Sequence, residues 1–364
     1  MSTVTSPGTT PVRPRSTPMS TVTSPGTTPV RPPRSRGAFA TAAVLAALLA
    51  AAVVLSLTVG ARATGLGTVW DALAATDPAN GDHAVVLSRI PRTLAGLVVG
   101  AALGVAGALM QGVARNPLAD PGILGINAGS ALAVVLGIHL VGLGTVTGYI
   151  WFAFAGAAAA AVLVYAVASL GREGATPVKL ALAGAALAAG LSSVMNAVLL
   201  MNSQALDAFR FWQVGTLGAR SVDEIGQVAP FLVAGGAVAL LSARLLNALA
   251  LGDDAARGLG IRVGRARALA AAGVVLLCGA ATALAGPIAF VGLVVPHALR
   301  ALVGGDYRKL LPLSLLAGPV LLLLADVAGR VVLPPTEVQV GVMTAVIGGP
   351  VFIWLVRARK RVAL

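Results

Sequence analysis

The stretch from Arg89 to Gly137, RIPRTLAGLVVGAALGVAGALMQGVARNPLADPGILGINAGSALAVVLG, decides the fold. Residues 93–114 carry no charged side chain, and this run is long enough for one helix to cross a hydrocarbon core. Gly96, Gly100 and Gly104 recur at four-residue spacing, which leaves one side of that helix nearly bare. In lipid, such a stripe lets a second helix approach closely. A polar turn with two prolines follows, so the residues predict two membrane helices joined by a stiff turn.

The composition extends this reading to the whole chain. Hydrophobic residues make up 57%, charged residues only 11%, and the mean hydropathy is +0.90. Soluble domains carry about 25% charged residues, so the chain is predicted to lie in a lipid bilayer. The net charge of +13 does not indicate nucleic-acid binding, because aromatics are few and no basic patch lies beside stacking residues. The single cysteine, Cys278, lies in an apolar span and is expected to be a small core residue.

The first 37 residues have a different composition, rich in Pro, Ser, Thr and Gly. The sequence MSTVTSPGTTPVRP occurs twice, at 1–14 and at 19–32, so the tandem copy leaves open whether translation starts at Met1 or Met19. Such a segment cannot bury enough apolar surface to fold. We expect residues 1–37 to be a disordered cytoplasmic tail with a tandem duplication, ahead of one transmembrane domain at 38–364.

The predicted fold class is all-α and polytopic, with about ten transmembrane helices. The predicted spans lie at about 38–59, 93–114, 180–201, 225–243, 268–285, 310–333 and 338–356, with two more between 117 and 172 and a short or partly embedded one ending near 299. Glycines at 142, 144 and 148 suggest the reversal between the third and fourth spans. Phe209, Phe211 and Trp212 are typical of a segment at the headgroup level.

Ten crossings place both termini on the same side of the membrane. Of the 26 Lys and Arg residues, six fall on the other side, which leaves 20 on the side of the termini. The six are Arg62, Arg89, Arg92, Arg210, Arg220 and Arg330. Because basic residues accumulate in cytoplasmic loops, both termini are predicted to be cytoplasmic in a multi-pass protein of the cell membrane.

The sequence offers little chemistry for driving transport by itself. Ion-coupled carriers keep acids or histidines deep in the bundle, whereas the mid-span positions here carry none. Asp326 and Arg330 lie near a span end, four residues apart on one helical face. No GxxxxGK[ST] phosphate loop is present either. If ATP drives this protein, a separate subunit must bind it.

An enzyme is not predicted. The chain has no HExxH motif, and Asp253-Asp254 has no second acidic motif with which to hold magnesium. We therefore expect no catalytic residue, metal site or cofactor in this chain. The competing hypotheses from other classes are a stand-alone ion-coupled carrier and a receptor-like or purely structural membrane protein.

Four segments, in order, resemble the FecCD-type permease family. They are the opening stretch, LNALALGDDAARGLG at 246–260, GPIAFVGLVVPHALR at 286–300, and LLLADVAGR with GVMTAVIGGPVFIWLVR at 322–357. The resemblance runs from about residue 40 to the C-terminus. It implies the membrane subunit of an ABC importer, with an iron(III)–siderophore complex as cargo and haem or vitamin B12 as alternatives. It also implies a second permease subunit, identical or related, two ATPase subunits that hold ATP and magnesium, and an extracytoplasmic solute-binding protein.

The resemblance also implies three sites. ATPase coupling is expected at Leu251, Gly252, Asp253, Asp254, Arg257, Gly258 and Gly260. Within this segment Asp253 and Asp254 could cap a short helix, and Gly258 or Gly260 could end it. A solvated turn without a partner is the alternative.

The second implied site is a cytoplasmic gate formed by Asn116 and Leu118, for which a purely structural turn is the alternative. The third is a basic docking surface for the binding protein, formed by Arg89, Arg92 and Arg330. Here the alternatives are a pairing of Arg330 with Asp326 at i,i+4 spacing, and contacts of the other two arginines with lipid phosphates. The family's second gating loop would fall near 174–178, where no residue can be assigned.

Overall fold

The long charge-free runs form helices, as the sequence predicts. The computed structural model describes residues 35–60, 62–75, 77, 79–143, 146–171, 176–218, 220–334 and 336–362, and it contains no strand among them. The expected tail lies almost wholly outside these residues, as do residues 174 and 175 of the segment at 174–178. The helices are α1 (Ser35–Thr58), α2 (Leu66–Ala74), α3 (Gly81–Val113), the 3-10 turn η1 (Pro121–Leu124), α4 (Ile126–Val141), α5 (Val146–Ala168), α6 (Pro177–Met201), α7 (Ser203–Trp212), α8 (Val222–Ala250), α9 (Asp253–Gly258), α10 (Val263–Ala285), α11 (Val291–Val303), α12 (Tyr307–Val332) and α13 (Val340–Val362).

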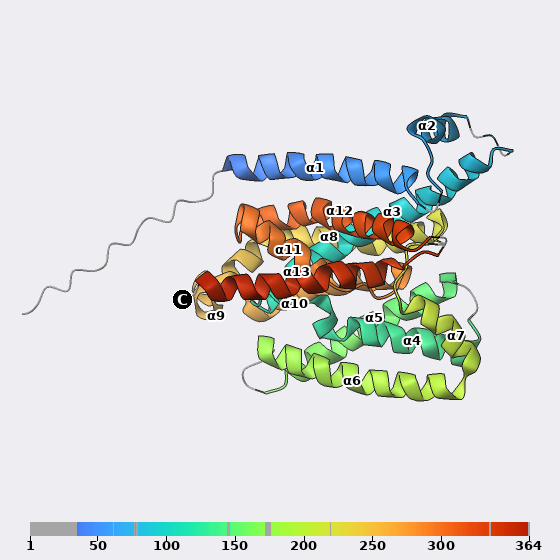
Figure 1. Cartoon of the computed structure of the whole chain (residues 1–364). Helices are drawn as coiled ribbons and strands as arrows, with labels where there is room; N and C mark the ends of the chain where they lie inside the picture. The colour runs from blue at the N-terminus through green and yellow to red at the C-terminus, as the bar shows by residue number, and fades with distance from the viewer. Residues whose placement is uncertain are drawn as a thin grey trace, which may run out of the picture. The chain divides into compact units, whose positions relative to one another are not determined.

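Seven helices in the described part of the chain are long and apolar enough to cross a membrane, namely α1, α3, α5, α6, α8, α10 and α12. Three shorter apolar helices, α4, α11 and the first part of α13, accompany them. These two groups match the predicted spans in order and place. The long helices run alongside one another, with α9 and α2 at opposite ends of the array (Figure 1). We call these the α9 end and the α2 end.

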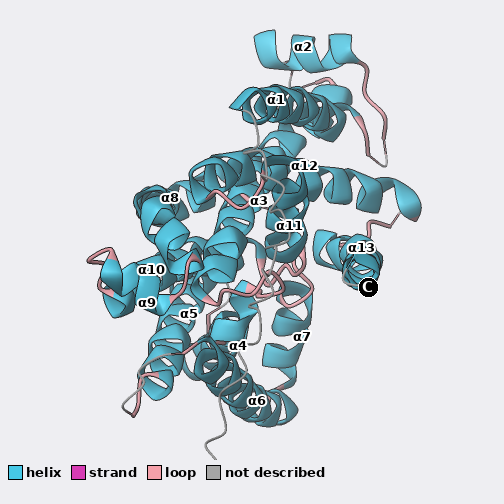
Figure 2. Ribbon diagram, turned by 90° about the vertical axis from the view of Figure 1, so that its left-hand side faces the viewer, coloured by secondary structure: helices cyan, strands magenta, loops and turns pink. Residues whose placement is uncertain are grey.

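Helix α3 lies in the middle of the bundle, among α8, α10, α11 and α12 (Figure 2). Its glycine stripe faces α12. A Cβ built at Gly100 would lie 2.6 Å from Cα of Pro319, and one at Gly104 would lie 2.9 Å from the carbonyl oxygen of Ser314. Gly96 is equally close to a leucine side chain of α12. The prediction of a close-approach stripe is confirmed, because any larger side chain would push α12 away.

The eighth predicted span is short in the structure. Helix α10 ends at Ala285, and α11 begins only after Phe290, whose φ of +68° breaks the helix. Gly292 at the start of α11 lies against Gly107, well inside α3. Helix α11 therefore covers only the part of the bundle toward the α9 end.

Tertiary packing changes one local expectation. Phe209 and Trp212 of α7 are 1% and 5% exposed, so these two side chains pack inside the protein instead of facing lipid headgroups. They bury inside because α7 packs against α4 and α6, and the Trp212 carbonyl lies against Gly286. At the predicted reversal, Gly142 ends α4 with φ +70°, whereas Gly148 lies within α5 and residue 144 is outside the described residues.

Candidate functional sites at the two ends of the bundle

The C-terminal end of α1 needs hydrogen-bond donors, because the last carbonyls of a helix have no partner within it. Arg330 of α12 donates from Nη1 to the carbonyl oxygens of Ser56 (2.8 Å) and Val59 (3.0 Å). Arg89 of α3 donates from Nη1 to the Leu57 carbonyl at 2.9 Å. Cations also suit the negative end of the helix dipole. Two of the three predicted docking arginines therefore hold the end of α1.

Arg330 also has a charged partner on its own helix. Its Nη2 lies 3.0 Å from Oδ2 of Asp326, and the two side chains are 2% and 1% exposed. The i,i+4 pairing that the sequence offered as an alternative is therefore present. Buried charges persist only when paired, so this contact satisfies both groups.

Arg92 joins the buried pair to the surface. Its Nη2 lies 2.8 Å from Oδ1 of Asp326, and its Nη1 lies 2.6 Å from Glu337, whose side chain is 37% exposed. The planar guanidinium thus divides its donors between a buried and an exposed carboxylate. We call Arg89, Arg92, Arg330, Asp326 and Glu337 the arginine cluster; it lies at the α2 end.

The three predicted docking arginines differ in burial, and their role in docking stays a prediction. Arg89 and Arg330 are buried, because the carbonyls of α1 and the Asp326 carboxylate draw them inward. Among the described residues, Arg92 alone of the three pairs with an exposed carboxylate. Glu337 was not identified from the sequence, since it lies 245 positions from Arg92 and no local pattern marks it.

At the α9 end, the polar turn after α3 is stiff. The Asn116 side-chain oxygen accepts a hydrogen bond from the Leu118 backbone N–H at 2.9 Å, and the Asn116 N–H donates to the Gln111 carbonyl at 3.2 Å. Arg115 has φ +45°, a left-handed conformation that turns the chain sharply. Asn116 and Leu118 are both exposed. Their role as a gate stays a prediction.

Asp120 closes the polar turn by capping η1. Its side chain accepts from the Gly122 N–H at 2.8 Å. Burial raises the pKa of the Asp120 carboxyl, and this hydrogen bond only partly offsets the effect. The turn is therefore fixed at both of its ends, at Asn116 and at Asp120.

The predicted short helix in the coupling segment exists as α9. It ends in a Schellman motif, with the Gly260 N–H donating to the Arg257 carbonyl (2.9 Å) and the Ile261 N–H to the Ala256 carbonyl (3.0 Å). Gly260, with φ +78°, is thus the terminating glycine, and Gly258 is the last helical residue. The expected aspartate cap is wrong, because the N-cap position is held by Gly252.

The two aspartates in the first turn of α9 have different surroundings. Asp253 Oδ1 lies 3.1 Å from Nη2 of Arg115 and 2.9 Å from Nη2 of Arg267. In the part of the chain that the structure describes, Asp254 pairs within its own helix, at 2.8 Å from Arg257, and its side chain is 100% exposed. Asp253 thus connects α9 to the polar turn and to α10. The sequence contains no local signal for this link, since Arg115 is remote from Asp253 along the chain.

A second polar cluster supports the same end. Arg300 of α11 donates to the Gln111 side chain of α3 and to the Tyr307 hydroxyl of α12, the latter at 3.1 Å. Gln111 also donates to the Leu293 carbonyl at 3.3 Å. The backbone carbonyl of Gln111 accepts the hydrogen bond from Asn116, while the Gln111 side chain contacts α11. The polar turn is therefore linked through α3 to α11, and through Arg300 to α12.

The geometry therefore comprises a bundle of apolar helices with a paired charge cluster at one end, and a stiff turn tied to a short helix at the other. The sequence pattern of the FecCD transport family matches residues 48–358. The chain belongs to this family. FecCD proteins are permease subunits of ABC importers, and ATP hydrolysis belongs to separate ATPase subunits. The chain is accordingly a multi-pass membrane protein.

Relatives of this FecCD permease match most of its length. The ferric enterobactin transport system permease protein FepD of Escherichia coli is 48% identical over 86% of this chain and 94% of its own. The cobalamin import system permease protein BtuC of Halobacterium salinarum is 40% identical over 76% of this chain and 74% of its own. An inward-facing structure assigned to the metal-chelate type of ABC transporter superposes with a TM-score of 0.76, at 27% identity, and covers 87% of this chain and 98% of that one.

Proposed function

We propose that this FecCD permease imports an iron(III)–siderophore complex. The observation that carries the proposal is the 48% identity to a permease named for ferric enterobactin. A second relative at 42% identity, from Bacillus subtilis, is also named for siderophore transport. Haem and vitamin B12 remain the alternative cargoes, since permeases named for hemin and cobalamin are 37% and 40% identical.

The proposed assembly contains two permease subunits, identical or related, which form the two halves of one path. Two ATPase subunits bind at the α9 end, and an extracytoplasmic solute-binding protein binds at the α2 end. The excess of arginine and lysine in the loops of the α9 end supports a cytoplasmic location for that end and for both termini. The substrate then enters at the α2 end and leaves at the α9 end.

Coupling is proposed to run from α9 to the polar turn. Leu251 and Leu259 flank α9 and are strongly exposed, which supports a surface that a partner covers. A movement of α9 imposed by the ATPase would pull on Asp253 and, through its contact with Arg115, on the adjacent turn. That turn carries Asn116 and Leu118, which we propose narrow the exit. Asp253 is thus proposed to transmit the movement, whereas Asp254 is not.

Docking of the binding protein is proposed to use Arg92. Its guanidinium reaches the exposed Glu337, so an acidic side chain of a partner could approach the same edge. Arg89 and Arg330 contribute indirectly by fixing α1 and Asp326 around it.

The cargo is tested by uptake in a strain that lacks the gene. We expect growth under iron chelation to be slow, to recover with excess iron salt, and to recover with the plasmid-borne gene. Uptake of radiolabelled ferric enterobactin, haemin and cobalamin is then measured in the same strain. Loss of cobalamin or haemin uptake with intact uptake of iron chelates would reject the siderophore assignment.

A further inference from the structure

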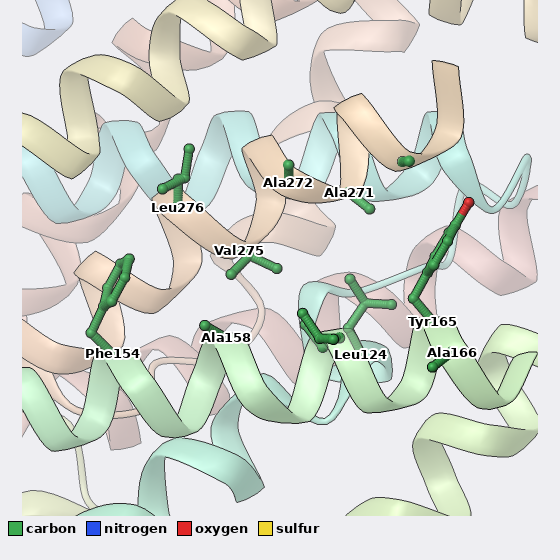
Figure 3. Close-up of a pocket in the computed structure, with 12 residues that line it drawn as sticks. Leu124, Phe154, Ala158, Tyr165, Ala166, Ala271, Ala272, Val275 and Leu276 are labelled. Carbon is green, nitrogen blue, oxygen red and sulfur yellow. The ribbon is translucent and has the colours of Figure 1, made fainter. Parts of the chain in front are cut away.

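An apolar groove lies between α5 and α10. It has a volume of about 460 Å³ and is lined mainly by small and aliphatic side chains. Figure 3 shows Ala158 and Tyr165 on α5 facing Val275 on α10, with Leu124 of η1 between the helices. Ala272 is exposed, so the groove opens onto the outside of the chain. Both helices are long and apolar enough to cross a membrane, and the groove therefore lies at the depth of lipid acyl chains.

A basic pocket of about 590 Å³ adjoins the α9 end. Its lining includes four arginines and one aspartate, namely Arg257, Arg262, Arg265, Arg267 and Asp253. The aspartate is already engaged by Arg267 and by Arg115 from outside the pocket. Arg262 and Arg265 are exposed, so the pocket presents positive charge to an incoming group. An anion suits this pocket better than a neutral or cationic ligand does.

Tyr165 connects the groove to the pocket. It lines both, and its hydroxyl donates to the Gly264 carbonyl at 3.3 Å, in the first turn of α10. In Figure 3 its ring rises from α5 beside the apolar side chains, with the oxygen at the far end. The two cavities thus adjoin at Tyr165, with an apolar length on one side and a cationic head on the other.

We infer that this site binds an anionic phospholipid of the leaflet at the α9 end. The phosphate lies between Arg262 and Arg265 and beside Arg257, which already pairs with Asp254, and one acyl chain lies in the groove between α5 and α10. Basic pockets between membrane helices suit anionic headgroups. An inorganic phosphate would fill only the basic pocket and leave the apolar groove empty. An acidic peptide that filled the groove would have to enter the hydrocarbon region of the membrane. The lipid also contacts α9 through Arg257, a consequence that rests on the proposed coupling role of α9.

The test measures lipid bound to the purified full-length permease by native mass spectrometry, with palmitoyl-oleoyl phosphatidylglycerol and the matching phosphatidylcholine as probes. We expect a preference for the glycerol lipid. Arg262→Gln combined with Arg265→Gln should reduce its affinity about 30-fold, since each basic residue near an anionic headgroup contributes about fivefold. Arg244→Gln combined with Arg308→Gln removes two exposed arginines outside the pocket, and this control should leave binding unchanged.

The acyl half of the site is tested with neighbouring alanines of α5. Ala158→Phe fills the groove and should lower retention of the glycerol lipid several-fold, whereas Ala159→Phe, on an exposed position outside the lining, should not. Equal retention of both lipids, or an unchanged affinity in the Arg262 and Arg265 double variant, would overturn the inference. Release of the lipid on addition of purified ATPase subunit would assign the pocket to that partner instead. None of these readouts depends on the cargo, so they separate this inference from the proposed function.

Discussion

The ion pairs near the two ends of α3 differ in how deeply their carboxylates are buried. At the α2 end, Arg92 meets Asp326, which is 1% exposed, within a cluster that ties α1, α3 and α12 together. At the α9 end, Arg115 meets Asp253, which is partly exposed and belongs to a six-residue helix. One cluster lies inside the main bundle, and the other links the bundle to a small peripheral element.

This difference separates a contact that maintains the fold from one that can move. Breaking a buried ion pair leaves an uncompensated charge in a low dielectric, which costs several kcal/mol. Breaking a partly exposed pair costs far less, because water replaces the partner. The α2 end is therefore expected to stay fixed while the α9 end changes during transport.

The largest effect is expected from Asp326→Asn. It leaves the buried Arg330 and the partly buried Arg92 without their shared carboxylate, which should destabilise the protein by roughly 3–5 kcal/mol. Thermal unfolding in detergent and the amount in the membrane measure this effect. The control is Glu337→Gln, which removes the exposed carboxylate from the same arginine and should cost little. Equal melting temperatures for Asp326→Asn and the wild type would contradict a fixed α2 end.

The next effect distinguishes adjacent aspartates of α9. Asp253→Asn weakens a charge-assisted contact worth roughly 1.5 kcal/mol, so transport per ATP hydrolysed should fall about tenfold. Asp254→Asn has the same chemistry on the same helix but reaches no other element, and its coupling should match the wild type. The assay is uptake and ATP hydrolysis in proteoliposomes with all subunits. If both variants couple equally well, Asp253 does not transmit movement to the polar turn.

A smaller effect concerns docking at the α2 end. Reversing Arg89 and Arg92 together would disrupt buried contacts, so Glu337→Gln is the cleaner change. It removes a negative charge from beside Arg92 and should speed association of the binding protein a few-fold, chiefly at low ionic strength. Surface-immobilised permease gives the association rate directly. An unchanged association rate at low salt would indicate that Arg92, like Arg89 and Arg330, has a structural role and does not contact the binding protein.

The smallest effect is a helix cap at the α9 end. Asp306 accepts from the Arg308 N–H (3.0 Å) and from Asn247 (2.7 Å). Burial alone would raise the pKa of its carboxyl, but the hydrogen bonds and the charges of Lys309 and Arg308 outweigh it, so the pKa lies below its ordinary 3.8. A lowered pKa means that the carboxylate stabilises the fold above that value and loses this contribution as the pH falls through the folded-state pKa.

Asp306→Ala should therefore cost about 1 kcal/mol at pH 7, the usual worth of a cap. The difference in melting temperature between the variant and the wild type should shrink as the pH falls below about 4. A difference that is the same at pH 7 and pH 3 would show that the charge of Asp306 contributes nothing.

The helices and their order could be predicted from the amino-acid sequence. Charge-free runs, the glycine stripe of α3 and the polar turn around Asn116 are local patterns, and local patterns encode the period and the ends of a helix. The presence of α9 could be predicted for the same reason. The resemblance to a family rested on contiguous motifs, which require no knowledge of the fold.

Only the tertiary structure decided which charges are buried and which partners they meet. Arg92 and Asp326 are 234 positions apart, and Arg92 and Glu337 are 245 apart. A pattern of neighbouring residues contains no information about the distance between such residues or about their burial. Arg89 and Arg330 were therefore predicted to lie on a surface, although they donate hydrogen bonds to the end of α1. Asp253 and Asp254 are identical in type and adjacent in sequence. They differ because helix packing brings Arg115 and Arg267 to one of them and leaves the other in solvent.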